Sequence, residues 1–226
     1  MKKRHLLVLR SLKAQRYQFA ALSVIVMLGV SIFISLTVAF NNMGGSYLRT
    51  YQELNFADFT VEVRGAPGDF AASILHVGTV AEAEARLVVD VGLPMGEGDI
   101  VQARLIGLPL ERRPVVNNIL VQSGSYWGPT AEDVVLVESR FATFHGLEAG
   151  DRLTFVTPTG ERGLTILGDA ASPEYLINAA SQVDILPSPR RFGVFFMPLP
   201  QLQELFGMEG TVNDFAVIMS DPKDRE

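Results

Sequence analysis

The sequence has no cysteine and only three histidines among its 226 residues. Without cysteine, disulfide scaffolds, thiolate-bound zinc, iron–sulfur centres and thiol catalysis are all excluded. A metal site built from His5, His76 and His145 is not expected with so few ligands. We therefore expect neither a metal ion nor a cofactor in this chain.

Charge is also scarce and unevenly distributed. Charged residues make up 19% of the chain, and the formal net charge is −6. Residues 1–16 carry six of the 19 Lys/Arg residues and no acid, so residues 17–226 hold 13 basic and 25 acidic residues, a net charge of −12. A nucleic-acid interface needs basic side chains gathered on one folded face, so a nucleic-acid partner is not expected.

Catalytic motifs are missing too. The segment Gly124–Gly128 (GSYWG) places its serine one position too early for a nucleophile elbow. Ser139 and His145 are six residues apart on one expected helix, which turns them away from each other. No glycine-rich loop precedes a Lys-Ser/Thr pair, so ATP binding by a P-loop is not expected. Glu82 and Glu84 are expected to be solvated surface charges, and the chain is not expected to be an enzyme.

One long apolar run, residues 19–40, contains no charge. As a helix it would cover roughly 33 Å, against a hydrocarbon core of about 30 Å, so it predicts a transmembrane helix. All six cations of residues 1–16 precede it, and the positive-inside rule then places the N-terminus in the cytoplasm and the remainder outside. The alternatives are a cleaved signal peptide, whose apolar region is usually shorter, and a buried helix of a soluble protein.

The span itself and the segments on either side of it also show sequence patterns. Within the span, Ser31, Ser35 and Ala39 recur at every fourth residue, a stripe that favours packing against a helix from outside this chain. Alternatively, the serines bond their own backbone. Residues 1–18 predict a basic amphipathic segment on the inner membrane surface, which makes membrane lipid a partner. Apolar residues spaced by three or four over residues 41–54 predict a helical stalk, with a flexible linker at Gly44-Gly45 as the alternative.

The sequence from residue 55 onward predicts a mixed α/β domain of two lobes outside the membrane. The expected fold class is therefore α+β with one N-terminal transmembrane helix. The first lobe, residues 55–110, is expected to be β-α-β-β and porter-like, with a helix at 69–76 and a hairpin turning at 95–99. The second, β-rich lobe covers residues 111–212. Its expected strands are 134–137, 153–156, 164–167 and 193–197, and its expected helices are 138–145 and one from Pro200 to Gly207.

The last segment, residues 213–226, predicts a returning strand at 214–219 with Phe215, Val217 and Met219 on one face. No helix follows that could cover this face. The sequence is therefore interpreted as truncated, the N-terminal part of a longer protein.

Two ordered segments, Val134–Ala142 and Gly146–Leu153, resemble the periplasmic core domain of FtsX/MacB-type ABC transporter permeases. In them Gly146 ends a helix, Gly150 permits a turn and Asp151 leads into a strand. Further on, Gly168 and the run Ser172-Pro173-Glu174-Tyr175 are similar to the family's strand-to-loop segment. One departure is Ser125, where the family often has arginine.

The resemblance implies a subunit in the bacterial cytoplasmic (inner) membrane that transmits motion to its extracytoplasmic domain, for export, extraction or signalling. The implied partners are a separate ABC ATPase subunit, which would bind the ATP, a second permease copy, and an extracytoplasmic adaptor or substrate protein. Two alternatives remain open: a single-pass binding module without energy coupling, and an envelope enzyme.

Overall fold

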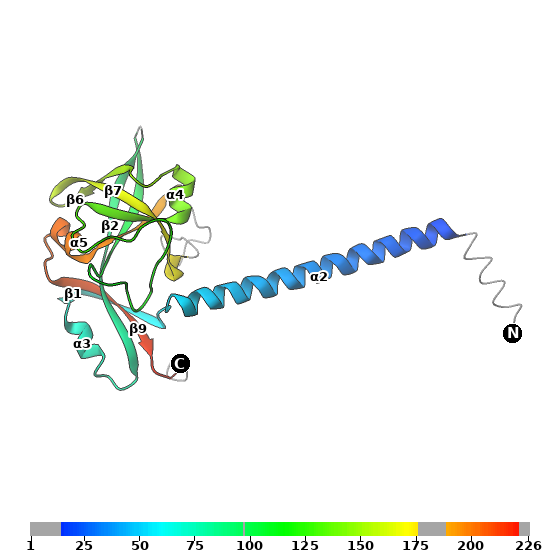
Figure 1. The fold of residues 1–226 in the computed structure, drawn as a ribbon, viewed down its shortest axis with the longest axis horizontal. Helices are drawn as coiled ribbons and strands as arrows, with labels where there is room; N and C mark the ends of the chain where they lie inside the picture. Colours follow the sequence, from blue (N-terminus) through cyan, green and yellow to red (C-terminus); the bar gives the residue numbers. More distant parts are fainter. Residues whose placement is uncertain (1–14, 97, 176–188, 222–226) are drawn as a thin grey trace, which may run out of the picture. The chain divides into compact units, whose positions relative to one another are not determined.

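The structure is a computed structural model that describes residues 15–96, 98–175 and 189–221 (Figure 1). The chain divides into two compact units, one ending at Thr50 and one beginning at Tyr51, and each is described by itself. The amphipathic segment expected over residues 1–18 lies almost entirely outside the described residues. The architecture is α+β, with one apolar N-terminal helix and a mixed sheet domain, as expected.

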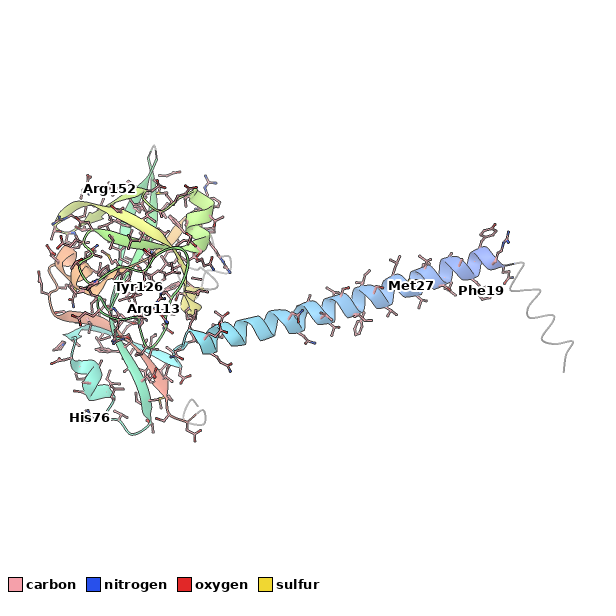
Figure 2. All side chains as sticks on the ribbon, in the orientation of Figure 1. Phe19, Met27, His76, Arg113, Tyr126 and Arg152 are labelled. Atoms are coloured by element: carbon pink, nitrogen blue, oxygen red, sulfur yellow. The ribbon has the colours of Figure 1, made fainter. Side chains whose placement is uncertain are left out.

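The N-terminal helix α2 (Arg16–Glu53) is 38 residues long. Its part from Arg16 to Asn42 is the one helix in the described chain that is long and apolar enough to cross a membrane, and its side chains point outward all round (Figure 2). The expected span, residues 19–40, lies within it. The helical backbone continues through Gly44 and Gly45, so the expected extension to residue 54 is correct to within one residue.

In its described residues, the second unit is built on nine strands with three short α-helices and one 3₁₀ turn. The strands are β1 (Phe59–Pro67), β2 (Val80–Met95), β3 (Asp99–Leu108), β4 (Leu120–Gly124), β5 (Val134–Glu138), β6 (Arg152–Thr157), β7 (Gly160–Ala171), β8 (Phe192–Pro198) and β9 (Thr211–Met219). The helices are α3 (Phe70–Ile74), α4 (Ser139–His145) and α5 (Leu199–Phe206), and the 3₁₀ turn is η1 (Pro173–Tyr175).

Strand β2 belongs to two sheets. The strand order is β1-β9-β2-β3-β8-β5-β7-β4, with β6 beside β7. Residues Val80–Arg86 of β2 pair with β9, and residues Leu87–Met95 pair with β3. We call β1, β9 and the first half of β2 the small sheet, and the remaining strands with the second half of β2 the large sheet. The junction between them lies between Arg86 and Leu87.

The large sheet is covered on both faces. On one face Leu105, Val137 and Phe195 pack with Phe141 of α4 and Leu202 of α5. On the other face Ile106, Leu136 and Phe196 pack with Trp127, and all are nearly inaccessible to solvent. Every residue of β8 is buried, which explains its unbroken apolar sequence, because a strand covered on both sides shows no alternation.

The placement of β9 corrects two expectations. It pairs with β1 on one side and β2 on the other, so the expected division into residues 55–110, 111–212 and 213–226 does not describe the pairing. The face carrying Phe215 and Val217, which was expected to lack a covering helix, packs against Ala71 and Ile74 of α3. This face of the small sheet is thus covered by α3, a helix far earlier in the sequence. A pattern limited to neighbouring residues does not reveal such a contact.

Most of the helices, strands and turns agree with those expected from the sequence. The β2–β3 hairpin turns at residues 95–99, where Gly96 and Gly98 have positive φ angles of 72° and 88°. Helix α4 starts at Glu138, whose carboxylate accepts the backbone N–H groups of Arg140 and Phe141, an N-cap contact. Strand β4 was not expected, because its short sequence LVQSG has only two apolar residues.

Candidate functional site

A polar cavity of about 550 Å³ lies across the junction of the two sheets. Its walls come from β1, β2, β3 and β9, from η1, and from the segments around Ala57 and Asn117. The lining includes five carboxylates and two guanidinium groups. These are Asp58, Glu62, Asp90, Glu174 and Asp214, with Arg86 and Arg104.

Arg86 is the buried centre of this site, with 2% of its surface exposed. Its Nη1 donates to Oε2 of Glu174 at 2.5 Å, and its Nη2 donates to Oε1 of the same residue at 3.0 Å. Its Nε donates to Oδ1 of Asp214 at 2.7 Å. Arg86 and Asp214 are register partners on β2 and β9, whereas Glu174 belongs to η1, the turn that follows β7. The side chain of Arg86 therefore joins the small sheet to this turn.

The electrostatics of this cluster follow from one cation serving two carboxylates. Burial alone would lower the pKa of Arg86, but Glu174 and Asp214 more than offset this, so its pKa is raised and it stays charged. Burial raises the pKa of Asp214, and Arg86 opposes that shift without cancelling it. Glu174 and Glu62 add to the upward shift of the Asp214 pKa, because each places a further negative charge nearby.

A second ion pair borders the cavity on the β2–β3 hairpin. Arg104 donates from Nε and Nη2 to the two oxygens of Asp90, at 2.8 and 2.9 Å, a bidentate geometry. Tyr175 is close to this pair. Burial raises the pKa of Tyr175 to about 12, Glu174 acts in the same direction, and Arg104 opposes it. The phenol is therefore neutral and the arginine charged at physiological pH.

Asn213 ties the two sheets together beside the cavity. Its Oδ1 accepts the backbone N–H of Val88 and its Nδ2 donates to the carbonyl of Val88, both at 2.8 Å. Val88 lies two residues beyond the junction, in the part of β2 that pairs with β3. The amide thus extends the hydrogen bonding of β9 past the junction, which restrains the angle between the sheets.

Glu82 and Glu84, both expected as solvated surface charges, are less accessible than that: Glu82 is half-buried with its Oε2 out of contact with solvent, and Glu84 is buried. The surroundings of Glu84 explain its burial. It is 3% exposed, and Arg112 donates to both its oxygens at 2.7 and 2.8 Å. The backbone N–H of Val115 also donates to Glu84. Glu84 therefore folds the connection between β3 and β4 onto the small sheet. In the same connection Arg113 lies over the ring of Tyr126, with 4.9 Å from its guanidinium carbon to the ring centroid (Figure 2).

We call this connection, residues 109–119, the clasp loop. It also forms hydrogen bonds with the first residues of the sheet domain. Asn118 donates its N–H to the carbonyl of Leu54, and Asn117 donates its N–H to that of Asn55. The N–H of Ala57 donates to Oδ1 of Asn117 at 2.7 Å. A fourth hydrogen bond runs from Nδ2 of Asn55 to the Val115 carbonyl at 3.0 Å, so these contacts fix the segment that follows α2 to the sheet domain.

The run Ser172-Pro173-Glu174-Tyr175, noted for its family resemblance, reaches the site. Glu174 and Tyr175 line the cavity, and Ser172 stabilises the turn by accepting the N–H of Glu174 at 3.3 Å. Arg86 and Asp214 were not expected there. For Asp214 the available signal was a charge beside the apolar run of β9, because a buried charge requires a partner, whereas Arg86 continues the alternation of Glu82 and Glu84 with alanine and gave no such signal.

The other motif residues have local structural roles. Gly146 ends α4 with a left-handed φ of 64°, and Gly150 has a φ of 98°. Asp151 closes the following turn by accepting the N–H of Glu148 at 2.8 Å. Gly168 lies opposite Gly124, where a Cβ would come within 2.1 Å of the Ser123 carbonyl oxygen. These residues shape the fold and do not line the cavity.

Neither a nucleophile–base pair nor a metal site is formed by the residues that the structure describes. Ser139 Oγ has no hydrogen-bond partner there, while Nε2 of His145 lies 3.0 Å from the carbonyl oxygen of Pro189. The described histidine and acidic residues form no group of three or more that could hold a metal ion. The stripe of Ser31, Ser35 and Ala39 lies on α2, and its packing role stays a prediction.

Comparison with known proteins gives structural neighbours only. No protein-family profile and no curated protein sequence matches the chain. The extracellular domain of the ABC-type transporter YknZ from Gram-positive bacteria has a TM-score of 0.47 at 12% identity, covering 71% of this chain and 76% of that one. The periplasmic region of MacB from Actinobacillus actinomycetemcomitans has a TM-score of 0.43 at 9% identity, with coverage of 72% and 67%.

A third neighbour is a domain of a protein assigned as a permease in Porphyromonas gingivalis. Its TM-score is 0.40 at 12% identity, and the alignment covers 74% of this chain and 79% of that one. At these TM-scores the backbones agree in outline only, so the function proposed below depends on the features of this chain.

Proposed function

We propose that this chain is a permease subunit of an ABC transporter, or the N-terminal part of one, and that it relays ATP-driven motion of a partner ATPase to an extracytoplasmic domain. The carrying observation is the uninterrupted backbone of α2, which extends from the apolar run to Glu53. The motifs that resemble FtsX/MacB-type permeases give the proposal its transporter class. Export, extraction and signalling are all compatible with such a relay.

A relay of this kind requires a stiff connection, and α2 has the dimensions for one. Thirty-eight helical residues span about 57 Å, of which roughly 30 Å would cross the hydrocarbon core. Its hydrogen-bond ladder passes through the two glycines, where a linker would have allowed free rotation. The clasp loop then fixes Leu54, Asn55 and Ala57 to the sheet domain, so displacement of these residues must move the sheets.

The proposed setting follows from the charge pattern and the resemblance. The six cations before the span favour an N-terminus in the cytoplasm of a bacterial cell, with the sheet domain outside the cytoplasmic membrane. ATP would be bound by the partner ATPase and not by this chain. A second copy of the permease would pack on α2 through Ser31, Ser35 and Ala39, and an extracytoplasmic adaptor or substrate protein would contact the sheet domain.

The second candidate is a single-pass binding module, in which the sheet domain captures a ligand without energy coupling. The observation that favours it is the charged cavity at the sheet junction, since a polar hollow of about 550 Å³ is within the usual size of ligand sites. The two candidates differ in whether nucleotide hydrolysis changes the geometry of the chain.

Distance measurements between spin labels in native membranes separate them. The chain has no cysteine, so Asn42→Cys and Glu132→Cys each give one label per chain, one on α2 and one on the sheet domain. The measured distance joins the same label on two copies of the chain. If the chain relays motion, ATP with vanadate shifts this distance for both labelled positions, relative to membranes without nucleotide. An unchanged distance distribution at both positions, with ATPase activity present in the same membranes, would contradict the relay and favour the binding module.

A further inference from the structure

The cavity at the sheet junction carries an unbalanced row of charges. Glu62 of β1, Asp214 of β9 and Arg86 of β2 are successive register partners across the small sheet. Two carboxylates therefore lie directly opposite each other, an arrangement that destabilises a sheet unless a cation joins them. Arg86 is already shared between Asp214 and Glu174, and the side chain of Glu62 makes no hydrogen bond or ion pair within the described residues.

A second observation concerns a hydrogen-bond donor in the wall of the same cavity. Asn117 lines it and is 1% exposed. Its Oδ1 accepts the N–H of Ala57, but its Nδ2 has no acceptor among the described residues. A buried amide donor is normally paired, so this unpaired group indicates that an acceptor is supplied from elsewhere.

The size and the donor set of the cavity select the kind of cation. A volume of about 550 Å³ holds far more than a metal ion, and no described group of carboxylates converges closely enough to coordinate one. A carboxylate pair with an amide donor nearby suits a ligand that has an ammonium or guanidinium group together with a carbonyl oxygen. A lysine or arginine residue within a peptide has both groups.

We propose that this cavity binds a basic side chain of a peptide, with its cation between Glu62 and Asp214 and a peptide carbonyl near Asn117. The bound cation would complete the row of charges across β1, β9 and β2. It would also relieve the repulsion between the two carboxylates. The inference concerns the sheet domain alone and does not depend on coupling to an ATPase.

The test titrates the full-length chain in zwitterionic micelles with Nα-acetyl-lysine methylamide and follows binding by calorimetry. The uncharged norleucine analogue is the matched control for the cation, and n-butylamine, a monocation without a carbonyl, is the control for the peptide carbonyl. We expect saturable binding in the millimolar range for the lysine compound, weaker binding of n-butylamine, and none of the norleucine compound.

The variant Glu62→Gln removes one carboxylate from an exposed strand, so its fold should survive. We expect its affinity for the lysine compound to fall by about fivefold, while Glu132→Gln, outside the cavity, leaves affinity unchanged. Equal binding of the norleucine compound, or an affinity insensitive to Glu62→Gln, would overturn the proposal. If n-butylamine binds as tightly as the lysine compound, the peptide part of the proposal is wrong.

Discussion

Replacing Arg86 with methionine should strongly destabilise the sheet domain. The substitution keeps an unbranched apolar stem but removes the guanidinium group, which leaves Asp214 and Glu174 facing each other without a cation, with side chains 7% and 18% exposed. Removing one partner of a buried pair typically costs about 3–5 kcal/mol. We expect the lower part of that range, because Glu174 can rehydrate in part and Asp214, whose pKa is already raised, can take up a proton.

Trp127 makes the measurement direct, since it is the only tryptophan and is 5% exposed in the folded chain. Urea unfolding of the full-length protein in micelles, followed by tryptophan fluorescence, gives the free energy of unfolding. Arg162→Met is the matched control. It removes an exposed arginine that has no described ion pair, so it should change stability by no more than about 0.5 kcal/mol.

A neutral variant tests the electrostatic reasoning itself. Arg86→Met combined with Asp214→Asn and Glu174→Gln removes all three charges, so it should recover much of the stability lost by Arg86→Met alone. The triple variant would leave polar amides where carboxylates were, and these are cheaper to bury unpaired than a charge. If Arg86→Met behaves like the Arg162→Met control, or if the triple variant is no more stable than the single one, the cluster does not hold the sheets together as argued here.

Three further predictions concern other parts of the chain. Because the folded pKa of Tyr175 is about 12 and its ordinary value is 10, stability should be lost as the pH rises from about 10 to about 12, and Tyr175→Phe should reduce that loss in urea unfolding at each pH. Gly168→Ala should cost on the order of 3 kcal/mol, because its Cβ would overlap the Ser123 carbonyl, whereas Gly128→Ala, with nothing within 4 Å, should be nearly neutral in thermal unfolding. Ser35→Cys should form an oxidative dimer in membranes if the stripe on α2 packs against a second copy, and failure to cross-link there would count against that interface.

The sequence predicted the local elements well because their causes are local. The apolar run defines α2, alternation defines β2 and β3, and glycines with positive φ define the turn between them. The α4 helix could likewise be located from Gly146 at its end. In each case the deciding interactions lie within a few residues of one another, so a one-dimensional pattern contains them.

The junction could not be predicted because its causes are distant in sequence. Arg86 meets Asp214 across 128 positions and Glu174 across 88. The first half of β2 pairs with a strand from the end of the chain, so a hairpin pattern shows only its second half. Of the residues noted for their family resemblance, Glu174 and Tyr175 reached the cavity, but their resemblance carried no information on the arginine that they face.

The arrangement of contacts decides where the sheet domain would yield if it were pulled. Asp58 holds one edge of β9 through two hydrogen bonds: its backbone N–H donates to the Val217 carbonyl, and its Oδ2 accepts the N–H of Met219, each at 2.8 Å. A load on the segment after α2 would therefore reach the small sheet first. Each sheet is held by a ladder of hydrogen bonds, whereas the junction between them is bridged by one continuous strand, the Asn213 amide, the side chain of Arg86 and the contacts of the clasp loop with Glu84. Bending should concentrate at Arg86 and Leu87, and since the cavity spans this junction, its shape would change before either sheet came apart.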